Sequence, residues 1–79
     1  MPGPGARLRW RARRGMKELD VLLERYLEHD YPRAARHERE AFARLLDLQD
    51  PELFGYLLGG VPAPDEEFRH VIARIRHDP

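Results

Sequence analysis

Apolar residues recur along this chain at intervals of three and four positions, which is the spacing of an amphipathic helix. The longest such stripe is Met16, Leu19, Leu22, Leu23, Tyr26 and Leu27. Shorter stripes lie in residues 34–47, 50–58 and 65–77: Ala35, Phe42, Leu45 and Leu46, then Leu53, Phe54, Leu57 and Leu58, then Phe68, Val71, Ile72 and Ile75. Arg7 to Arg13 alternates arginine with apolar residues, but a lone strand is unstable, so we expect a short first helix there that ends near Gly15. The predicted fold class is therefore all-α, a compact bundle of about five short helices.

Proline, glycine and acidic residues mark the expected helix ends. Tyr31-Pro32 should end the second helix, because a residue before proline is disfavoured in the α conformation. The fourth helix should start at Asp50-Pro51, with the Asp50 carboxylate capping free amides and Pro51 at the first helical position. Gly59-Gly60 should close that helix with a left-handed residue. The acidic run Asp65-Glu66-Glu67 should open the fifth helix.

The length of 79 residues suits one helical domain over residues 6–77, preceded by a disordered Pro/Gly tail over residues 1–5. A domain of this size buries only ~60% of the surface of its unfolded chain, so functional residues should lie on its surface. The shared core is predicted to contain Leu19, Leu23, Leu27, Phe42, Leu46, Leu57, Phe68, Ile72 and Ile75.

Several residue types that enzymes use are missing from the chain. It has no Cys, Ser, Thr or Asn, which removes disulfides, thiolates and hydroxyl nucleophiles other than tyrosine. Its glycines form neither a dinucleotide-binding nor a Walker A pattern, so we expect a protein that is not an enzyme. No apolar run nears the ~20 residues of a membrane span, and the first residues lack an apolar signal core. We therefore expect a cytoplasmic protein. The excess of arginine over lysine is typical of GC-rich bacterial genomes, so we expect a bacterial source.

The charge is unevenly distributed although its sum is zero. Residues 1–17 contain six basic residues and no acid, whereas the remainder contains eight basic residues against fourteen acids. This asymmetry indicates a basic face for an acidic partner, or a nucleic-acid arm in which Trp10 stacks on a base. In the simpler interpretation the arginines are solvated and Trp10 belongs to the core. The nucleic-acid hypothesis is the weaker one, because the acidic remainder would repel a phosphate backbone.

The segment from Arg13 to Asp20 allows two interpretations. In the first, Gly15 is a helix C-cap glycine followed by a charged, solvated first turn. In the second, Gly15 lets the backbone of another protein approach closely, because it has no Cβ atom. Arg14 and Glu18 are four residues apart. They would share one face if the helix extended back through Gly15, and would then present a guanidinium fork beside a carboxylate.

The histidines are His29, His37, His70 and His77. Glu67 and His70 have the Glu-x-x-His spacing of di-iron bundles, but such sites need a second copy and two further glutamates, and the chain has no second copy. His70 and His77 alone do not make a metal site. We therefore expect surface histidines and no bound metal. The contrary hypothesis, a metal-dependent enzyme, would require stoichiometric metal in the purified protein.

A longer string resembles a known family. It is Arg7-Leu8-x-Trp10-x-x-Arg13-Arg14-Gly15-Met16-x-Glu18-Leu19-Asp20, which is similar to the opening of the succinate dehydrogenase assembly factors that promote flavinylation. Arg14, Gly15 and Glu18 meet the R-G-x-x-E signature of that family. The likeness continues through Glu28-His29-Asp30-Tyr31, Phe42-x-x-Leu45-Leu46, Asp50-Pro51-Glu52-Leu53-Phe54 and the acid-rich last helix. It covers residues 7 to 76.

The resemblance implies a five-helix protein that binds the flavoprotein subunit of succinate dehydrogenase, and often of fumarate reductase. Such a protein aids covalent attachment of FAD to a histidine of that subunit, so FAD belongs to the partner and this chain holds no cofactor stably. By the same resemblance the partner-binding residues are Arg13, Arg14, Gly15, Met16, Glu18, Asp20, Asp50 and Tyr56. Relatives often have tryptophan at Tyr56, preceded by a polar residue where this chain has Gly55.

Three questions stay open at this point: whether FAD is contacted directly, which flavoprotein is preferred, and the oligomeric state, for which we expect a monomer. The alternative function is that of a small nucleic-acid-associated or regulatory protein that uses the basic N-terminal segment.

Overall fold

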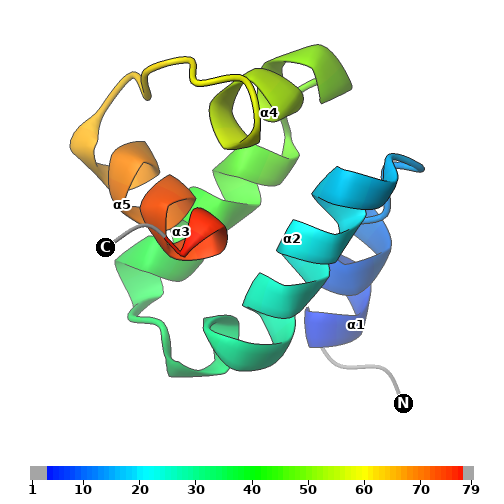
Figure 1. Ribbon diagram of the computed structural model, residues 1–79. Coiled ribbons are helices and arrows are strands. Elements are labelled where there is room, and N and C mark those ends of the chain that lie inside the picture. The colour runs from blue at the N-terminus through cyan, green and yellow to red at the C-terminus, as the bar shows by residue number, and fades with distance from the viewer. Residues whose placement is uncertain (1–3, 78–79) are drawn as a thin grey trace.

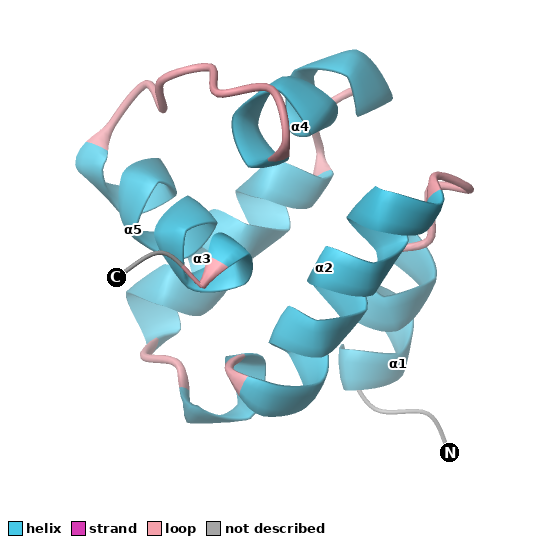
Figure 2. Cartoon of the chain, in the orientation of Figure 1, coloured by secondary structure: helices cyan, strands magenta, loops and turns pink. Residues whose placement is uncertain are grey.

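Five α-helices and one short 3-10 helix make up the computed structural model, which describes residues 4–77 (Figure 1). They are α1 (Pro4–Arg11), α2 (Lys17–His29), η1 (Tyr31–Arg33), α3 (Arg36–Leu46), α4 (Asp50–Leu57) and α5 (Glu66–Arg76). Within this range the chain forms no strand, and the longest connection joins α4 to α5 (Figure 2). The predicted all-α bundle of five helices is confirmed.

The helices share one hydrophobic core. α5 packs against α2, α3 and α4, whereas α1 packs against α2 at the edge of the bundle (Figure 1). All nine of the predicted core residues are buried, and four of them, Leu19, Leu23, Phe42 and Ile75, have no exposed surface. Leu8 and Ala12 bring α1 onto the same core. The period of the apolar stripes therefore identified the buried face of α2, α3 and α5. For α4 it was half wrong, because Leu53 and Leu57 are buried whereas Phe54 and Leu58 are 38% and 37% exposed.

The first helix differs from its prediction at both ends. α1 begins at Pro4, inside the expected disordered tail, and it ends at Arg11, before the expected end near Gly15. Proline is well placed in a first helical turn, because its missing N–H would have no partner there. The rest of the expected tail, residues 1–3, lies outside the described residues.

The second helix ends where the proline predicted it, and η1 follows after Asp30. The third helix starts later than expected, at Arg36, because Ala34 and Ala35 are extended, with ψ angles of 146° and 161°. Ala35 is the N-cap residue and is exposed. The prediction that Ala35 points inward was wrong, since a residue outside the helix does not follow its 3.6-residue period.

Two predicted helix ends are confirmed by their hydrogen bonds. Gly60 has a φ of 74°, and the Val61 N–H donates to the Gly55 carbonyl at 3.0 Å, which closes α4. The Asp65 carboxylate accepts a hydrogen bond from the Phe68 N–H at 2.8 Å, which caps α5. None of the helices described is both long and apolar enough to cross a membrane.

Candidate partner-binding site at the Gly15 turn

The connection from α1 to α2, residues 12–16, forms a tight turn that we call the Gly15 turn. Gly15 has a φ of 77°, a left-handed conformation that side chains other than glycine adopt with strain. A Cβ atom built on Gly15 would meet no atom within 4 Å. Because α1 has already ended at Arg11, Gly15 is a turn residue and not the C-cap glycine of the simpler interpretation. The turn thus presents bare backbone with open space beside it.

Asp20, in the first turn of α2, holds the Gly15 turn in place. Its carboxylate accepts hydrogen bonds from two successive amides, the Arg14 N–H at 2.8 Å and the Gly15 N–H at 3.2 Å. Hydrogen bonds from amides to an ionised carboxylate are stronger than neutral ones. These two hydrogen bonds therefore hold the turn against the start of α2.

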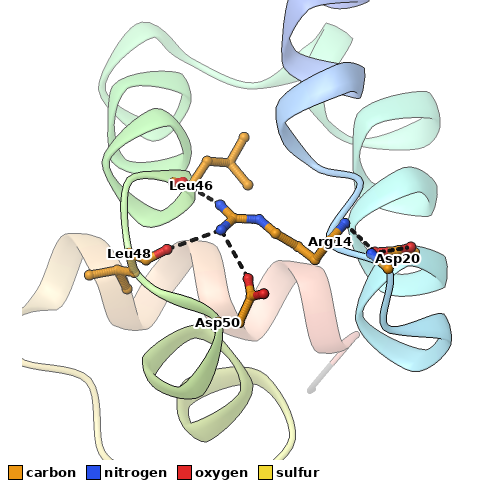
Figure 3. Close-up of polar contacts among 6 residues, drawn as sticks. Arg14, Asp20, Leu46, Leu48 and Asp50 are labelled. Atoms are coloured by element: carbon orange, nitrogen blue, oxygen red, sulfur yellow. Dashed lines mark hydrogen bonds and ion pairs between the residues drawn. The ribbon is translucent and has the colours of Figure 1, made fainter.

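Arg14 holds the same turn from its other side. Figure 3 shows the guanidinium pointing into the corner between α3 and α4. It donates to the Leu46 carbonyl, to the Leu48 carbonyl at 3.1 Å, and to Asp50 Oδ1 at 3.1 Å. The Arg14 side chain is only 15% exposed. Arg14 therefore joins the N-terminal pair of helices to the end of α3 and the start of α4.

Arg14 and Glu18 do not share one face, because the condition for that arrangement is not met. It required the second helix to extend back through Gly15, but α2 begins at Lys17 and Met16 is extended, with a φ of −112°. Glu18 is exposed on the first turn of α2, and its carboxylate has no polar partner among residues 7–77. The two charged groups consequently lie in different surroundings: the Arg14 guanidinium is inside the bundle, and the Glu18 carboxylate is in solvent.

The expected capping role of Asp50 was also wrong. Gln49 is the N-cap of α4 and makes no side-chain cap hydrogen bond, and Pro51 is the second helical residue, not the first. The Asp50 carboxylate instead pairs with Arg14. A buried guanidinium needs an anionic partner more than a solvent-accessible helix end does, since the amides at that end can bond to water.

The remaining candidate residues differ in how accessible they are. Arg13 is exposed, whereas Met16 is half-buried and packs against the core. Tyr56 is half-buried in the last turn of α4, where its ring and that of Phe68 make a T-shaped contact with centroids 6.4 Å apart. Its aromatic contact is thus with α5 and not with the Gly15 turn. Among the candidate residues, those with exposed charged groups near the turn are Arg13 and Glu18.

A cavity of about 400 Å³ lies beside the turn, between α1 and α2. Its lining includes Ala12 and Leu27 together with charged residues of both signs: Arg9, Arg13, Asp20 and Glu24. Gly15 forms part of its wall. The bare backbone of Gly15 therefore adjoins a recess that a side chain from another protein can enter.

Half of the basic residues near the N-terminus are already neutralised. Arg9 pairs with Glu28 at 3.7 Å, Arg11 with Asp47 at 2.5 Å, and Arg14 with Asp50. The other three, Arg7, Arg13 and Lys17, are exposed and form no ion pair with any residue from 7 to 77. Trp10 is 77% exposed, so the interpretation that placed it in the core was wrong. Leu8 and Ala12 occupy the inward face of α1, and Trp10 lies opposite them.

Sequence reasoning missed a buried polar cluster at the junction of α2, α3 and α5. The Tyr26 hydroxyl donates to Glu38 Oε2 at 2.6 Å, and His70 Nε2 lies 2.9 Å from Glu38 Oε1. Burial and the hydrogen bond to Glu38 both raise the pKa of Tyr26 well above its ordinary range. The signal was in the sequence, because Glu38 occupies the inward stripe of α3 with Ala41, Phe42 and Leu45.

His70 is accordingly a partner of the buried Glu38 and not simply a surface histidine. Its side chain is still 57% exposed, so it covers Glu38 from the solvent side. Among residues 7–77 no three side chains of His, Asp or Glu are placed to share a metal ion.

Comparison with known proteins shows that the sequence is similar to one family. The pattern of the family described as "Flavinator of succinate dehydrogenase" matches residues 6–79. The FAD assembly factor SdhE of Coxiella burnetii is 43% identical over 75 residues, which cover 95% of this chain and 92% of that protein. The protein of the same name from Xylella fastidiosa is 46% identical over 70 residues, which cover 89% of this chain and 72% of that protein. The protein of that name from Shewanella oneidensis is 39% identical over 71 residues, which cover 90% of this chain and 87% of that protein.

No solved structure matches the chain. The family pattern spans nearly all of the sequence, including the Gly15 turn. The chain belongs to the family of flavinators of succinate dehydrogenase.

Proposed function

We propose that this chain binds the flavoprotein subunit of succinate dehydrogenase and promotes covalent attachment of FAD to that subunit. The family description and the name FAD assembly factor, carried by relatives that align over most of their length, support this activity. The observation that carries the proposal is the Gly15 turn, an exposed backbone segment held rigid by Asp20 and Arg14. A rigid, bare turn beside a recess is suited to close contact with another backbone.

The residues of the site have two roles in this proposal. Gly15, Arg13 and Glu18 touch the partner, because their backbone or side chains are accessible. Arg14, Asp20 and Asp50 keep the turn in its binding shape through the hydrogen bonds among them. Met16 and Tyr56 contribute mainly through packing, since both are half-buried. Substitutions in the two groups should therefore have different effects on stability.

The chain itself acts as a binding protein in this proposal and supplies no catalytic residue. FAD and the histidine that receives it both belong to the flavoprotein. Holding reacting groups in a productive, water-poor arrangement lowers a reaction barrier without any chemical group from the helper. The Gly15 turn would supply that constraint by fitting closely against the partner's backbone.

The test is a reconstituted flavinylation assay. Purified apo-flavoprotein, FAD and the chain are mixed and denatured at intervals, and in-gel flavin fluorescence of the large subunit reports covalent FAD. The parent chain should accelerate attachment. Gly15→Ala should slow attachment and Gly15→Arg should abolish it, because the larger side chain fills more of the open space in which the partner's backbone would lie. Both variants carry the same backbone strain at Gly15, so the pair separates partner contact from folding.

A second pair of variants tests the Glu18 carboxylate. Glu18→Gln should slow flavinylation, because it removes the exposed negative charge beside the turn. Glu66→Gln is the matched control, since Glu66 is an exposed first-turn glutamate of α5, and α5 lies across the bundle from α1 (Figure 1). Equal attachment rates with and without the parent chain would overturn the proposed function. The fumarate reductase flavoprotein, assayed in parallel, shows which of the two subunits is preferred.

A further inference from the structure

We propose that the outer face of α1 is a second part of the partner interface, with Trp10 inserted into an apolar recess of the flavoprotein that is rimmed by carboxylates. We call Trp10, together with the exposed cations Arg7 before it and Arg13 and Lys17 after it in the chain, the Trp10 surface. The inference rests on the proposed function, because it names what the same partner must offer beyond the Gly15 turn.

The exposure of Trp10 is the first observation. It is 77% exposed, more than any other large apolar residue among those described. Burying an indole ring that water now surrounds is strongly favourable, and tryptophan is the residue type most enriched at binding hot spots. Leu8 and Ala12 already attach α1 to the core from its other face, at 9% and 4% exposure. The fold therefore has no need of Trp10, and the outer face of the helix is left uncovered.

The charge around Trp10 is the second observation. Arg7 lies one helical turn before Trp10. Arg13 is the second residue after α1, and its N–H donates to the Trp10 carbonyl at 3.2 Å. Lys17 opens α2. All three cations are exposed and lack ion-pair partners within residues 7–77, unlike Arg9, Arg11 and Arg14. An aromatic anchor within a rim of uncompensated positive charge is complementary to an apolar recess with an acidic rim.

Continuity with the Gly15 turn is the third observation. Arg13 belongs to the Trp10 surface and also lines the recess beside Gly15. Two residues separate Trp10 from Arg13, and Gly15 follows two positions later, so a protein seated on the turn meets the end of α1 as well. The turn fixes the orientation of the partner, and Trp10 supplies buried apolar area.

A nucleic acid fits the Trp10 surface less well than a protein does. The neighbouring α2 exposes Glu18, Glu24 and Glu28, and the last of these already pairs with Arg9. These carboxylates would repel a phosphate backbone laid along α1. A folded protein can place its acidic groups beside the three free cations and keep them away from α2.

The first arm of the test measures affinity for the purified flavoprotein. Trp10→Ala should weaken binding by about 30-fold or more, as truncation of a hot-spot residue does. Trp10→Phe should restore part of the affinity. Arg7→Gln and Arg13→Gln should lower the association rate and flatten its dependence on salt, which is the effect of charges at an interface rim. Arg36→Gln is the matched control, because Arg36 is 92% exposed on α3.

The second arm observes the indole directly. Trp10 is the single tryptophan of the chain, so the chain labelled with 5-fluorotryptophan gives one fluorine resonance. That resonance should shift on addition of flavoprotein and become protected from a soluble paramagnetic agent. Trp10→Ala should melt within about 4 °C of the parent, as expected for an exposed position. Loss of affinity without protection of the resonance would overturn the inference, because the indole would then act through the fold.

Two further outcomes separate the hypotheses. If the parent binds the flavoprotein and Trp10→Ala binds equally well, the inference fails while the proposed function stands. Failure of the parent itself to bind would remove the proposed function and the inference together. A resonance perturbed by a single-stranded oligonucleotide and not by flavoprotein would replace the inference with nucleic-acid binding.

Discussion

Replacing Arg14 by alanine should destabilise this protein far more than any other substitution of a charged residue in the N-terminal segment. The change removes three hydrogen bonds, to the carbonyls of Leu46 and Leu48 and to the Asp50 carboxylate. Leu46 is the last residue of α3, so its carbonyl is one of the unpaired acceptors at a helix end. A positive charge at that end also interacts favourably with the helix dipole.

The magnitude follows from these contacts. Hydrogen bonds to a charged group contribute ~1.5–3 kcal/mol each, and a cation at a helix C-terminus contributes ~0.3–1 kcal/mol. These contributions do not add fully, because water can reach the vacated carbonyls at the surface of the corner. The buried Arg14 Nε, which has no hydrogen-bond partner among the described residues, offsets part of the gain. We therefore expect a loss of ~2–4 kcal/mol.

That loss is large for a chain of this size. A domain of 79 residues has a total free energy of unfolding of about 4–12 kcal/mol. The melting temperature should fall by about 10–30 °C, since each kcal/mol shifts it by ~4–8 °C in small domains. Flavinylation by Arg14→Ala should consequently fail at temperatures where the parent still works, and recover on cooling.

The assay is urea denaturation followed by far-ultraviolet circular dichroism. Arg14→Lys should fall between parent and alanine variant, because an ammonium keeps the charge and cannot form the same forked set of hydrogen bonds. Arg13→Ala is the matched control, an exposed neighbour whose loss should change stability by less than about 0.5 kcal/mol. A denaturation midpoint for Arg14→Ala no lower than that of Arg13→Ala would refute the anchoring role of Arg14.

Three further substitutions test other parts of the structure. Leu23→Ala, at a residue with no exposed surface, should cost ~2–5 kcal/mol in the same urea assay, and a smaller loss would mean that the core there is loosely packed. The pKa of Tyr26 is raised above its ordinary value of 10.0, so its contribution to stability is intact below that pH. Above pH 10 the Tyr26 hydroxyl ionises in the unfolded chain but not in the folded one, so the free energy of unfolding falls by ~1.4 kcal/mol per pH unit. Tyr26→Phe should lack this slope in urea titrations at alkaline pH. Gly15→Arg should stay folded and lose ~1–3 kcal/mol through its left-handed backbone, and a melting curve like that of the parent would mean that the turn relaxes.

The core was predictable because its signal is local. Leu19, Leu23 and Phe42 lie on stripes whose period alone says which face is buried. The orientation of Trp10 was predictable too, since Leu8 and Ala12 are four residues apart and leave Trp10 on the opposite face, but the alternation with arginine concealed this.

The roles of charged residues could not be predicted in the same way, because they depend on what lies across the bundle. Arg14 turns inward since the corner between α3 and α4, more than 30 residues further along the chain, offers it two carbonyls and a carboxylate. Glu38 is buried because Tyr26 of α2 and His70 of α5, which lie 12 and 32 residues away in the sequence, bond to its carboxylate. The family resemblance pointed to Arg14, Gly15 and Glu18 but did not indicate which of them face solvent.

The thin attachment of α1 sets how the N-terminal region moves. Within α1 and the residue after it, only Leu8 and Ala12 of those described lie in the core. The ion pairs of Arg9 with Glu28 and of Arg11 with Asp47 are both partly exposed. Segments with so few buried contacts open at a free energy below that of global unfolding. α1 can thus detach and reclose while α2, α3 and α5 stay folded. A partner that requires α1 closed is bound with an affinity reduced by the closed fraction, so the packing of Leu8 and Ala12 adjusts how tightly such a partner is held.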